Sequence, residues 1–150
     1  MAEPSQFEQT IEMVKYRRRR DDRDIEAIRQ FLYMAPNVMY LKNYSNPDIG
    51  GVYVFVSREF ERMHELPSEK VMGKTDFEVF PQPVAERRNR DHLHTLQFRQ
   101  PTVLVDTIGT RYNGFKPYRM QLMPIRVHGE ENPTYLAGIT LAPLAHWQDA

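Results

Sequence analysis

The chain of 150 residues contains no cysteine, and this absence excludes several kinds of site. Without thiols there is no disulfide, no thiolate-based zinc site and no cysteine nucleophile. A chromophore linked covalently through cysteine is excluded for the same reason. Any cofactor must therefore be held noncovalently or through another residue type.

Net charge and long apolar runs are also absent. Lys plus Arg and Asp plus Glu both total 20, so the formal net charge is zero and gives no support for a nucleic-acid partner. No apolar run approaches the ~20 residues that a membrane span needs, and the N-terminus lacks the apolar core of a secretory signal. We therefore expect a cytoplasmic protein with no nucleic-acid partner and no membrane span.

Residues 1–35 have the pattern of a helix, in which apolar residues recur at alternating steps of four and three. This heptad spacing is typical of helices that pair with other helices. Arg18 and Asp21 occupy the middle of the pattern, where unpaired buried charge is unfavourable, so we expect a break or a solvent-filled crossing near residues 17–22. We predict that residues 1–35 form a helical cap that mediates homodimerisation through Phe7, Ile11, Val14, Ile25, Ile28 and Leu32.

The rest of the chain, residues 36–145, predicts one α+β domain. Strand patterns with turn-rich links occur at residues 38–42, 50–57, 101–108, 118–127 and 134–143. Short helical pieces fill the stretch from residue 58 to residue 96. Two strands alternate strictly, which predicts one dry face made by Tyr118, Met120 and Leu122 and, on the last strand, by Tyr135, Ala137, Ile139 and Leu141.

The segment "VMGKTDFEVFP" (residues 71–81) has the features of a turn followed by a short helix. Gly73 can take a positive φ, and Thr75 or Asp76 can cap the helix by accepting a backbone N–H bond. We interpret Asp76 as a cap rather than as a catalytic residue.

Three stretches in this order resemble a PAS domain. They are "YVFVSREFERMHELPSEKVMGKTDFEVFP", "PVAERRNRDHLHTLQFRQPTVLV" and "YLAGITLAP". The resemblance covers roughly residues 36–143 and implies a five-stranded antiparallel sheet with short helices on one face. The sequence departs from the family at Gly138, where many PAS sensors carry the Asp of an Asp-Ile-Thr ending. The salt bridge through which that Asp helps couple the core to an output helix is therefore not implied here.

PAS domains commonly enclose a pocket that binds haem, flavin, a small metabolite or nothing. Nine residues are expected to project from different elements toward one interior and to form an apolar ligand pocket. They are Phe60, Met63, Phe77, Phe80, His92, Leu93, Leu96, Met120 and Leu122. A filled core made by the same residues is the alternative that the sequence leaves open.

The segment "RDHLHTL" (residues 90–96) carries two histidines, which diverge on a helix and cannot share a metal ion. The apolar face of this helix is predicted to consist of Ala85, Asn89, Leu93 and Leu96. His92 lies at the edge of that face, as a structural histidine or pocket wall rather than as a haem ligand.

We therefore expect a sensory or interaction domain that binds a small apolar ligand or partner and signals through dimer packing, without catalysis and without a metal. An output domain or partner protein is also expected. The alternatives are a sensor that binds haem through His92 or flavin noncovalently, and a small enzyme that uses His64, His92 or Asp76 as acid or base.

Overall fold

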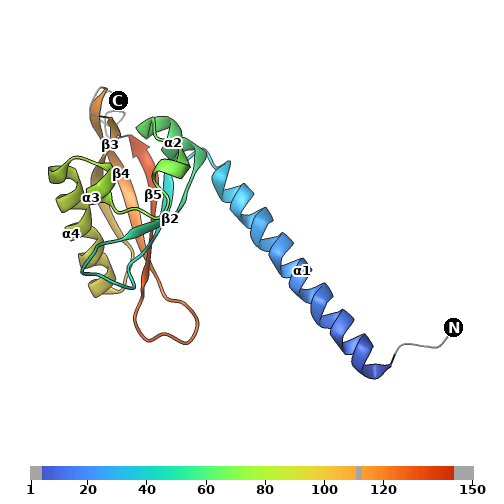
Figure 1. Ribbon diagram of the computed structural model, residues 1–150. Coiled ribbons are helices and arrows are strands. Elements are labelled where there is room, and N and C mark those ends of the chain that lie inside the picture. Colours follow the sequence, from blue (N-terminus) through green and yellow to red (C-terminus); the bar gives the residue numbers. More distant parts are fainter. Residues whose placement is uncertain (1–4, 111–112, 144–150) are drawn as a thin grey trace. The chain divides into compact units, whose positions relative to one another are not determined.

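The structure is a computed structural model that describes residues 5–110 and 113–143. The chain forms two units, which divide between Tyr33 and Met34. The first contains a single helix, and the second is an α+β unit built on a five-stranded sheet (Figure 1). The division into residues 1–35 and 36–145 remains a prediction, and residues 1–4, 144 and 145 lie outside the described part of the chain.

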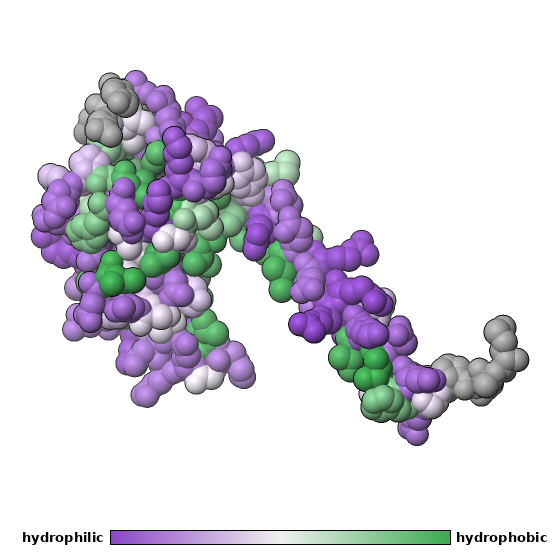
Figure 2. All heavy atoms as spheres, viewed as in Figure 1, coloured by the Kyte–Doolittle hydropathy of each residue, from purple (hydrophilic) through white to green (hydrophobic). Residues whose placement is uncertain are grey.

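Helix α1 (Gln6–Tyr33) is continuous, so the predicted break near residues 17–22 is wrong. The helix begins with a reciprocal capping box, in which the Ser5 and Glu8 side chains each accept a hydrogen bond from the other residue's backbone N–H. No residue of α1 is buried, so the charged middle needs no partner to remain helical. Figure 2 shows apolar side chains toward both ends of α1 and hydrophilic ones between them.

The sheet of the second unit has the strand order β2-β1-β5-β4-β3, and every pair of neighbours is antiparallel. Its strands are β1 (Met39–Asn43), β2 (Val52–Val56), β3 (Thr102–Thr110), β4 (Gly114–Ile125) and β5 (Tyr135–Pro143). All five predicted strands are present. The first two pair as a hairpin and the last three as a meander, and β5 joins the two groups by pairing with β1.

One predicted face is wrong. Met120 and Leu122 of β4 are buried as expected, but on β5 the buried residues are Leu136, Gly138 and Thr140. The alternate residues of β5, which carry more apolar side chains, lie on the opposite face of the sheet. A prediction from side-chain hydrophobicity alone gave the wrong face of β5, because a glycine and a threonine lie on the buried face.

The helices between β2 and β3 lie on one face of the sheet (Figure 1). They are α2 (Arg58–His64), the 3-10 turn η1 (Ser68–Lys70), α3 (Asp76–Val79) and α4 (Gln82–Phe98). Ser57 caps α2 by accepting a bond from the Phe60 N–H, and Thr75 caps α3 in a capping box with Glu78. Gly73 has a φ of 78°, as predicted for the turn before α3. None of the described helices is long and apolar enough to cross a membrane.

Candidate functional site

Four charged side chains lie inside the second unit, between the sheet and the helices. They are Lys42, Asp76, Arg88 and Asp106, and none is more than 4% exposed. Two positive and two negative charges balance each other. Together with Tyr40, Tyr44, Tyr53 and His92, they form what we call the polar cluster.

Asp76 connects the two positive charges of the polar cluster. Its carboxylate accepts hydrogen bonds from the Lys42 ammonium and the Tyr53 hydroxyl, and Arg88 Nη1 lies 3.8 Å from Oδ1. Burial alone would raise the pKa of Asp76, but the charges of Lys42 and Arg88 outweigh burial and hold the pKa below its ordinary value. Asp76 is therefore an ionised partner of two buried cations, and its predicted role as the helix cap is wrong because Thr75 occupies that position.

Arg88 joins helix α4 to the edge strand β3. Its Nε lies 3.3 Å from Oδ1 and 3.2 Å from Oδ2 of Asp106, and its Nη2 donates to the Thr107 carbonyl at 2.5 Å. The half-buried Arg87 adds a second guanidinium at 3.2 Å from Asp106. Among the described residues, Arg87 Nε is the one buried side-chain polar atom without a hydrogen-bond partner.

His92 is enclosed by the polar cluster. Nε2 lies 3.1 Å from the Tyr40 hydroxyl, while Nδ1 lies 3.2 Å from the Tyr44 hydroxyl and 3.3 Å from Lys42 Nζ. Because the ammonium can only donate, Nδ1 accepts and Nε2 carries the proton of the neutral ring. Burial and the charge of Lys42 hold the pKa of His92 well below its ordinary value. His94 is exposed and stacks on Phe98, so the two histidines diverge as the helical spacing predicts.

Two glycines make room for the tyrosines of this cluster. A Cβ at Gly138 would lie 2.3 Å from the ring of Tyr40, and a Cβ at Gly51 would lie 2.3 Å from the ring of Tyr44. Real side chains cannot approach so closely. The absence of a side chain at both positions therefore lets each tyrosine lie against the sheet and reach His92.

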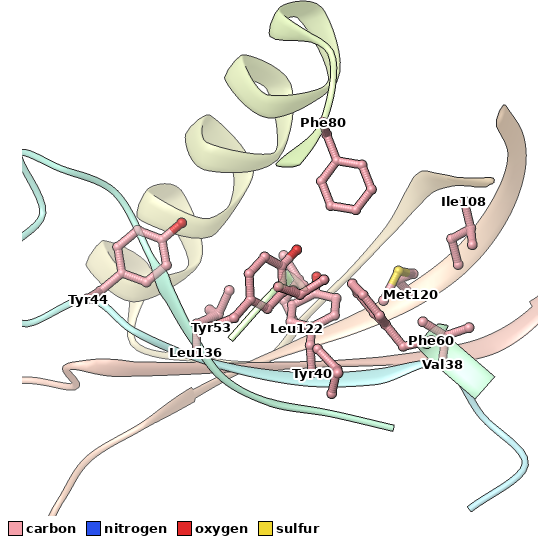
Figure 3. Close-up of a cluster of buried hydrophobic side chains, with 12 residues drawn as sticks. Val38, Tyr40, Tyr44, Tyr53, Phe60, Phe80, Ile108, Met120, Leu122 and Leu136 are labelled. Carbon is pink, nitrogen blue, oxygen red and sulfur yellow. The ribbon is translucent and has the colours of Figure 1, made fainter. Parts of the chain in front are cut away.

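The nine residues predicted to form one apolar pocket are placed in several different environments. Phe60, Phe80, Met120 and Leu122 belong to the buried core (Figure 3). Met63, Leu93 and Leu96 pack against that core with partial exposure. Phe77 is 39% exposed and lines a shallow surface groove together with Leu93. The interior is not wholly apolar, because the polar cluster, His92 included, lies beside these residues.

A cleft of about 440 Å³ opens beside the end of α2, α3 and the β3–β4 hairpin. Its apolar walls are Leu66, Val79, Phe80 and Phe115. Glu65 and Glu78 also line it, and both are exposed. The cleft falls in the size range of pockets that bind small molecules.

His64 is the polar residue in the wall of this cleft, although its side chain is only 3% exposed. The imidazole ring packs between Phe60, at 4.5 Å, and Phe80, at 4.9 Å between ring centroids. Its Nδ1 lies 2.9 Å from the Gly109 carbonyl oxygen and 3.4 Å from the Gly109 nitrogen. The shorter contact is to a carbonyl oxygen, which can only accept, so Nδ1 carries the proton and donates it. Burial and the charge of Arg88 lower the pKa of His64 to about 3. The neutral ring thus leaves Nε2 as a hydrogen-bond acceptor, and no described residue donates to it.

Phe80 separates the cleft from the polar cluster. The Arg88 guanidinium carbon lies 4.5 Å from the centroid of the Phe80 ring, and the same ring contacts His64. Figure 3 shows Phe80 projecting from the helical side toward the residues of the sheet. One aromatic side chain therefore touches both the buried charges and the open cleft.

The polar cluster was largely missed from the sequence, but it left a signal in β1. Tyr40 and Lys42 alternate on β1 and Tyr44 follows directly after it, and all three are buried, so a lysine shares a buried face with two aromatic residues. On α4 the buried residues are Ala85, Arg88, His92 and Thr95. Ala85 was predicted correctly, but the other three predicted positions, Asn89, Leu93 and Leu96, each lie one residue beyond the buried one. Among the described residues, no group of three or more His, Asp or Glu side chains could hold a metal ion.

Comparisons with solved structures show which fold this is. The LOV protein of Rhodobacter sphaeroides is similar with a TM-score of 0.62 and 18% identity, over 81% of this chain and 67% of that one. A PAS domain of an HTR-like protein from Haloarcula marismortui has a TM-score of 0.62 and 14% identity, over 85% and 98%. VqmA, solved bound to DPO, has a TM-score of 0.62 and 16% identity, over 79% and 56%.

No protein-family model matches the sequence, and no curated protein matches it. The structural matches confirm the predicted fold, an α+β PAS domain preceded by an N-terminal helix.

Proposed function

We propose, from the PAS fold that this chain adopts, that it is a sensory domain without catalysis of its own. It binds a small, mainly apolar ligand in the cleft beside α3 and signals through association with a second copy or another partner. The observation that carries the proposal is the cleft itself, in which a buried histidine presents among apolar walls an acceptor to which no described residue donates. VqmA, which is similar over 56% of its own chain, was solved bound to DPO.

The polar cluster does not fit haem bound through His92. Both ring nitrogens of His92 lie within hydrogen-bond distance of cluster side chains, so neither is free to coordinate iron. Noncovalent flavin does not fit there either, because Tyr40, Lys42 and Tyr53 fill this interior and are at most 4% exposed. The same closure argues against an enzyme that uses Asp76 or His92, since no substrate reaches them.

The cleft favours a particular ligand chemistry. Leu66, Val79 and Phe115 suit a flat apolar ring, and His64 Nε2 accepts a bond from an N–H or O–H group. The exposed carboxylates of Glu65 and Glu78 disfavour an anionic ligand. A neutral ring compound that carries one donor therefore fits best.

A pair of probes tests this site directly. Indole and 1-methylindole have nearly the same shape, but only indole has an N–H donor. In a ¹H–¹⁵N NMR titration of the full chain, we expect both to shift the backbone amides of Val79, Gly109 and Phe115. Indole should bind about threefold to tenfold more tightly, the effect of one net hydrogen bond. Equal affinities, or shifts confined to other parts of the chain, would overturn the site.

Two variants test the hydrogen-bond acceptor and the apolar wall of the cleft. His64→Phe keeps a ring between Phe60 and Phe80, and it should abolish the preference for indole while 1-methylindole still binds. Val79→Trp should fill the cleft and weaken both probes. Val103→Trp is the matched control, because Val103 is 53% exposed on the opposite face of the sheet and its replacement should change neither affinity.

An absorption spectrum of gently purified protein tests the cofactor alternatives. We expect no haem or flavin band, and a band of either kind would contradict the closed interior described above.

A further inference from the structure

The six apolar residues of α1 are arranged symmetrically about its centre. Phe7 and Leu32 stand at the two ends of the seam, with Ile11 and Ile28 next and Val14 and Ile25 inside them. Arg18 and Asp21 occupy the two central positions. Each residue pairs with the one at the same distance from the opposite end, so reversing the helix exchanges apolar for apolar and arginine for aspartate.

Exposure shows that this seam is available to a partner. The apolar residues of the seam are exposed or half-exposed, with Val14, Ile25 and Ile28 at 57–58%. A helix of 28 residues is about 42 Å long and presents the whole seam on one side. Steps of four and three keep the residues on one stripe, as the packing of two helices requires.

The central charges distinguish the two ways in which a second copy could pack. In a parallel pair, Arg18 would face Arg18 and Asp21 would face Asp21 inside the seam. In an antiparallel pair, Arg18 of each copy faces Asp21 of the other, and every apolar residue still meets an apolar residue. The charges beside the seam pair favourably in both arrangements, since Arg17 would face Asp22 in a parallel pair and Asp24 in an antiparallel pair. The centre of the seam therefore discriminates between them.

We infer that α1 is the docking surface for a second copy of this chain and that the two helices pair antiparallel in a single register. The register is fixed by the contact of Arg18 with Asp21 and of Ile11 with Ile28. Charges in such a seam specify orientation and reduce affinity compared with an all-apolar seam. The pair is therefore weaker but better defined than one built on apolar residues alone.

The inference deepens the proposed signalling function, and it rests on that function for its biological meaning. Antiparallel pairing makes residues 34 onward of the two copies leave the helix pair at opposite ends. A change in the PAS unit would then act on the pair from both ends.

The absence of native cysteine makes a disulfide test clean. Ile11→Cys mixed with Ile28→Cys should give a disulfide-linked dimer under mild oxidation, and each variant alone should give little. Efficient linkage of Ile11→Cys with itself would indicate a parallel pair and overturn the inference. So would a yield in the mixture no higher than that of Val103→Cys, an exposed strand position that reports random collisions.

Charge variants test the centre of the seam. Arg18→Asp should weaken association in sedimentation by about tenfold or more, because two like charges then meet in each layer. Mixing Arg18→Asp with Asp21→Arg should restore it. The double variant Arg18→Leu with Asp21→Leu should tighten association and let Ile11→Cys link to itself. Failure of either result would overturn the role of these charges.

The two proposals fail separately. Cross-linking without indole binding would leave the antiparallel pair standing and remove the ligand site. Indole binding without specific cross-linking would do the reverse.

Discussion

Two buried histidines, His64 and His92, show how differently one residue type is used in neighbouring regions of the described chain. His92 lies in the polar cluster, where cluster side chains contact both ring nitrogens. His64 lies one aromatic ring away, with Nδ1 bonded to Gly109 and Nε2 left for the cleft. The first arrangement is closed and structural, and the second is open and suited to binding. Burial alone therefore does not identify a functional histidine.

The largest expected effect comes from removing a charge of the closed region. Asp76→Asn leaves Lys42 and Arg88 buried without their shared carboxylate, which should lower the free energy of unfolding by about 3–5 kcal/mol. Urea denaturation followed by circular dichroism measures it. Asp48→Asn, at an exposed position, is the control and should change stability by less than about 0.5 kcal/mol. A loss below about 1 kcal/mol for Asp76→Asn would show that the cluster charges are solvated.

The dependence of stability on pH should reflect both histidines. Each has a lowered pKa in the folded chain, so the unfolded chain takes up protons first as the pH falls below about 6.5. Stability is fully present above that pH and declines toward lower pH, down to about pH 3 for His64. Each histidine contributes up to about 1.4 kcal/mol per pH unit.

His64→Phe checks this prediction. Its unfolding free energy, measured by urea denaturation between pH 6 and pH 4.5, should fall less steeply than that of the original chain. Identical slopes would mean that His64 keeps an ordinary pKa in the folded state. Below about pH 4, protonation of Asp76 adds a further loss in both proteins, because its folded pKa is also depressed.

Phe80→Leu should make the separation between the cleft and the polar cluster less complete. A smaller side chain between His64 and Arg88 should lower stability by about 1–1.5 kcal/mol. It should also speed exchange of the His92 imidazole proton with water, measured by NMR. Unchanged exchange would show that another residue closes the cluster.

The smallest change in stability is expected for a substitution in the wall of the cleft. Val79→Ala removes two methyl groups from a half-buried wall of the cleft, and stability should fall by at most about 1 kcal/mol. The same urea assay measures it. A loss as large as that of Asp76→Asn would show that the cleft is part of the core.

Much of the fold could be predicted from the sequence because strand alternation and turn residues are local signals. The strand pattern, the N-terminal helix and the capped turn at Thr75 all depend on residues a few positions apart. The polar cluster depends on partners far apart in sequence: Lys42 meets Asp76 across 34 positions, and Arg88 meets Asp106 across 18. The sequence pattern treats a charged residue as exposed unless its partner is known. For this reason three of the four predicted buried positions of α4 were placed one residue away.

The site was predicted less well than the fold for the same reason. Phe80 was correctly expected to face inward, but its neighbours on either side, Arg88 and His64, were not expected to be its partners. The open nitrogen of His64 depends on the Gly109 carbonyl, 45 positions away. No spacing within α2 indicates that contact.

Gly138 restricts which residues can occupy position 40 during evolution, and Tyr40 restricts position 138 in the same way. Because a Cβ there would overlap the ring of Tyr40, no residue other than glycine can arise at 138 while Tyr40 stays in place. Among natural relatives of this chain, we expect the two positions to vary together, with glycine opposite tyrosine or a side chain opposite a smaller residue. Since the Tyr40 hydroxyl lies beside His92, position 92 should follow them. A relative with a side chain at position 138 should therefore also differ at positions 40 and 92.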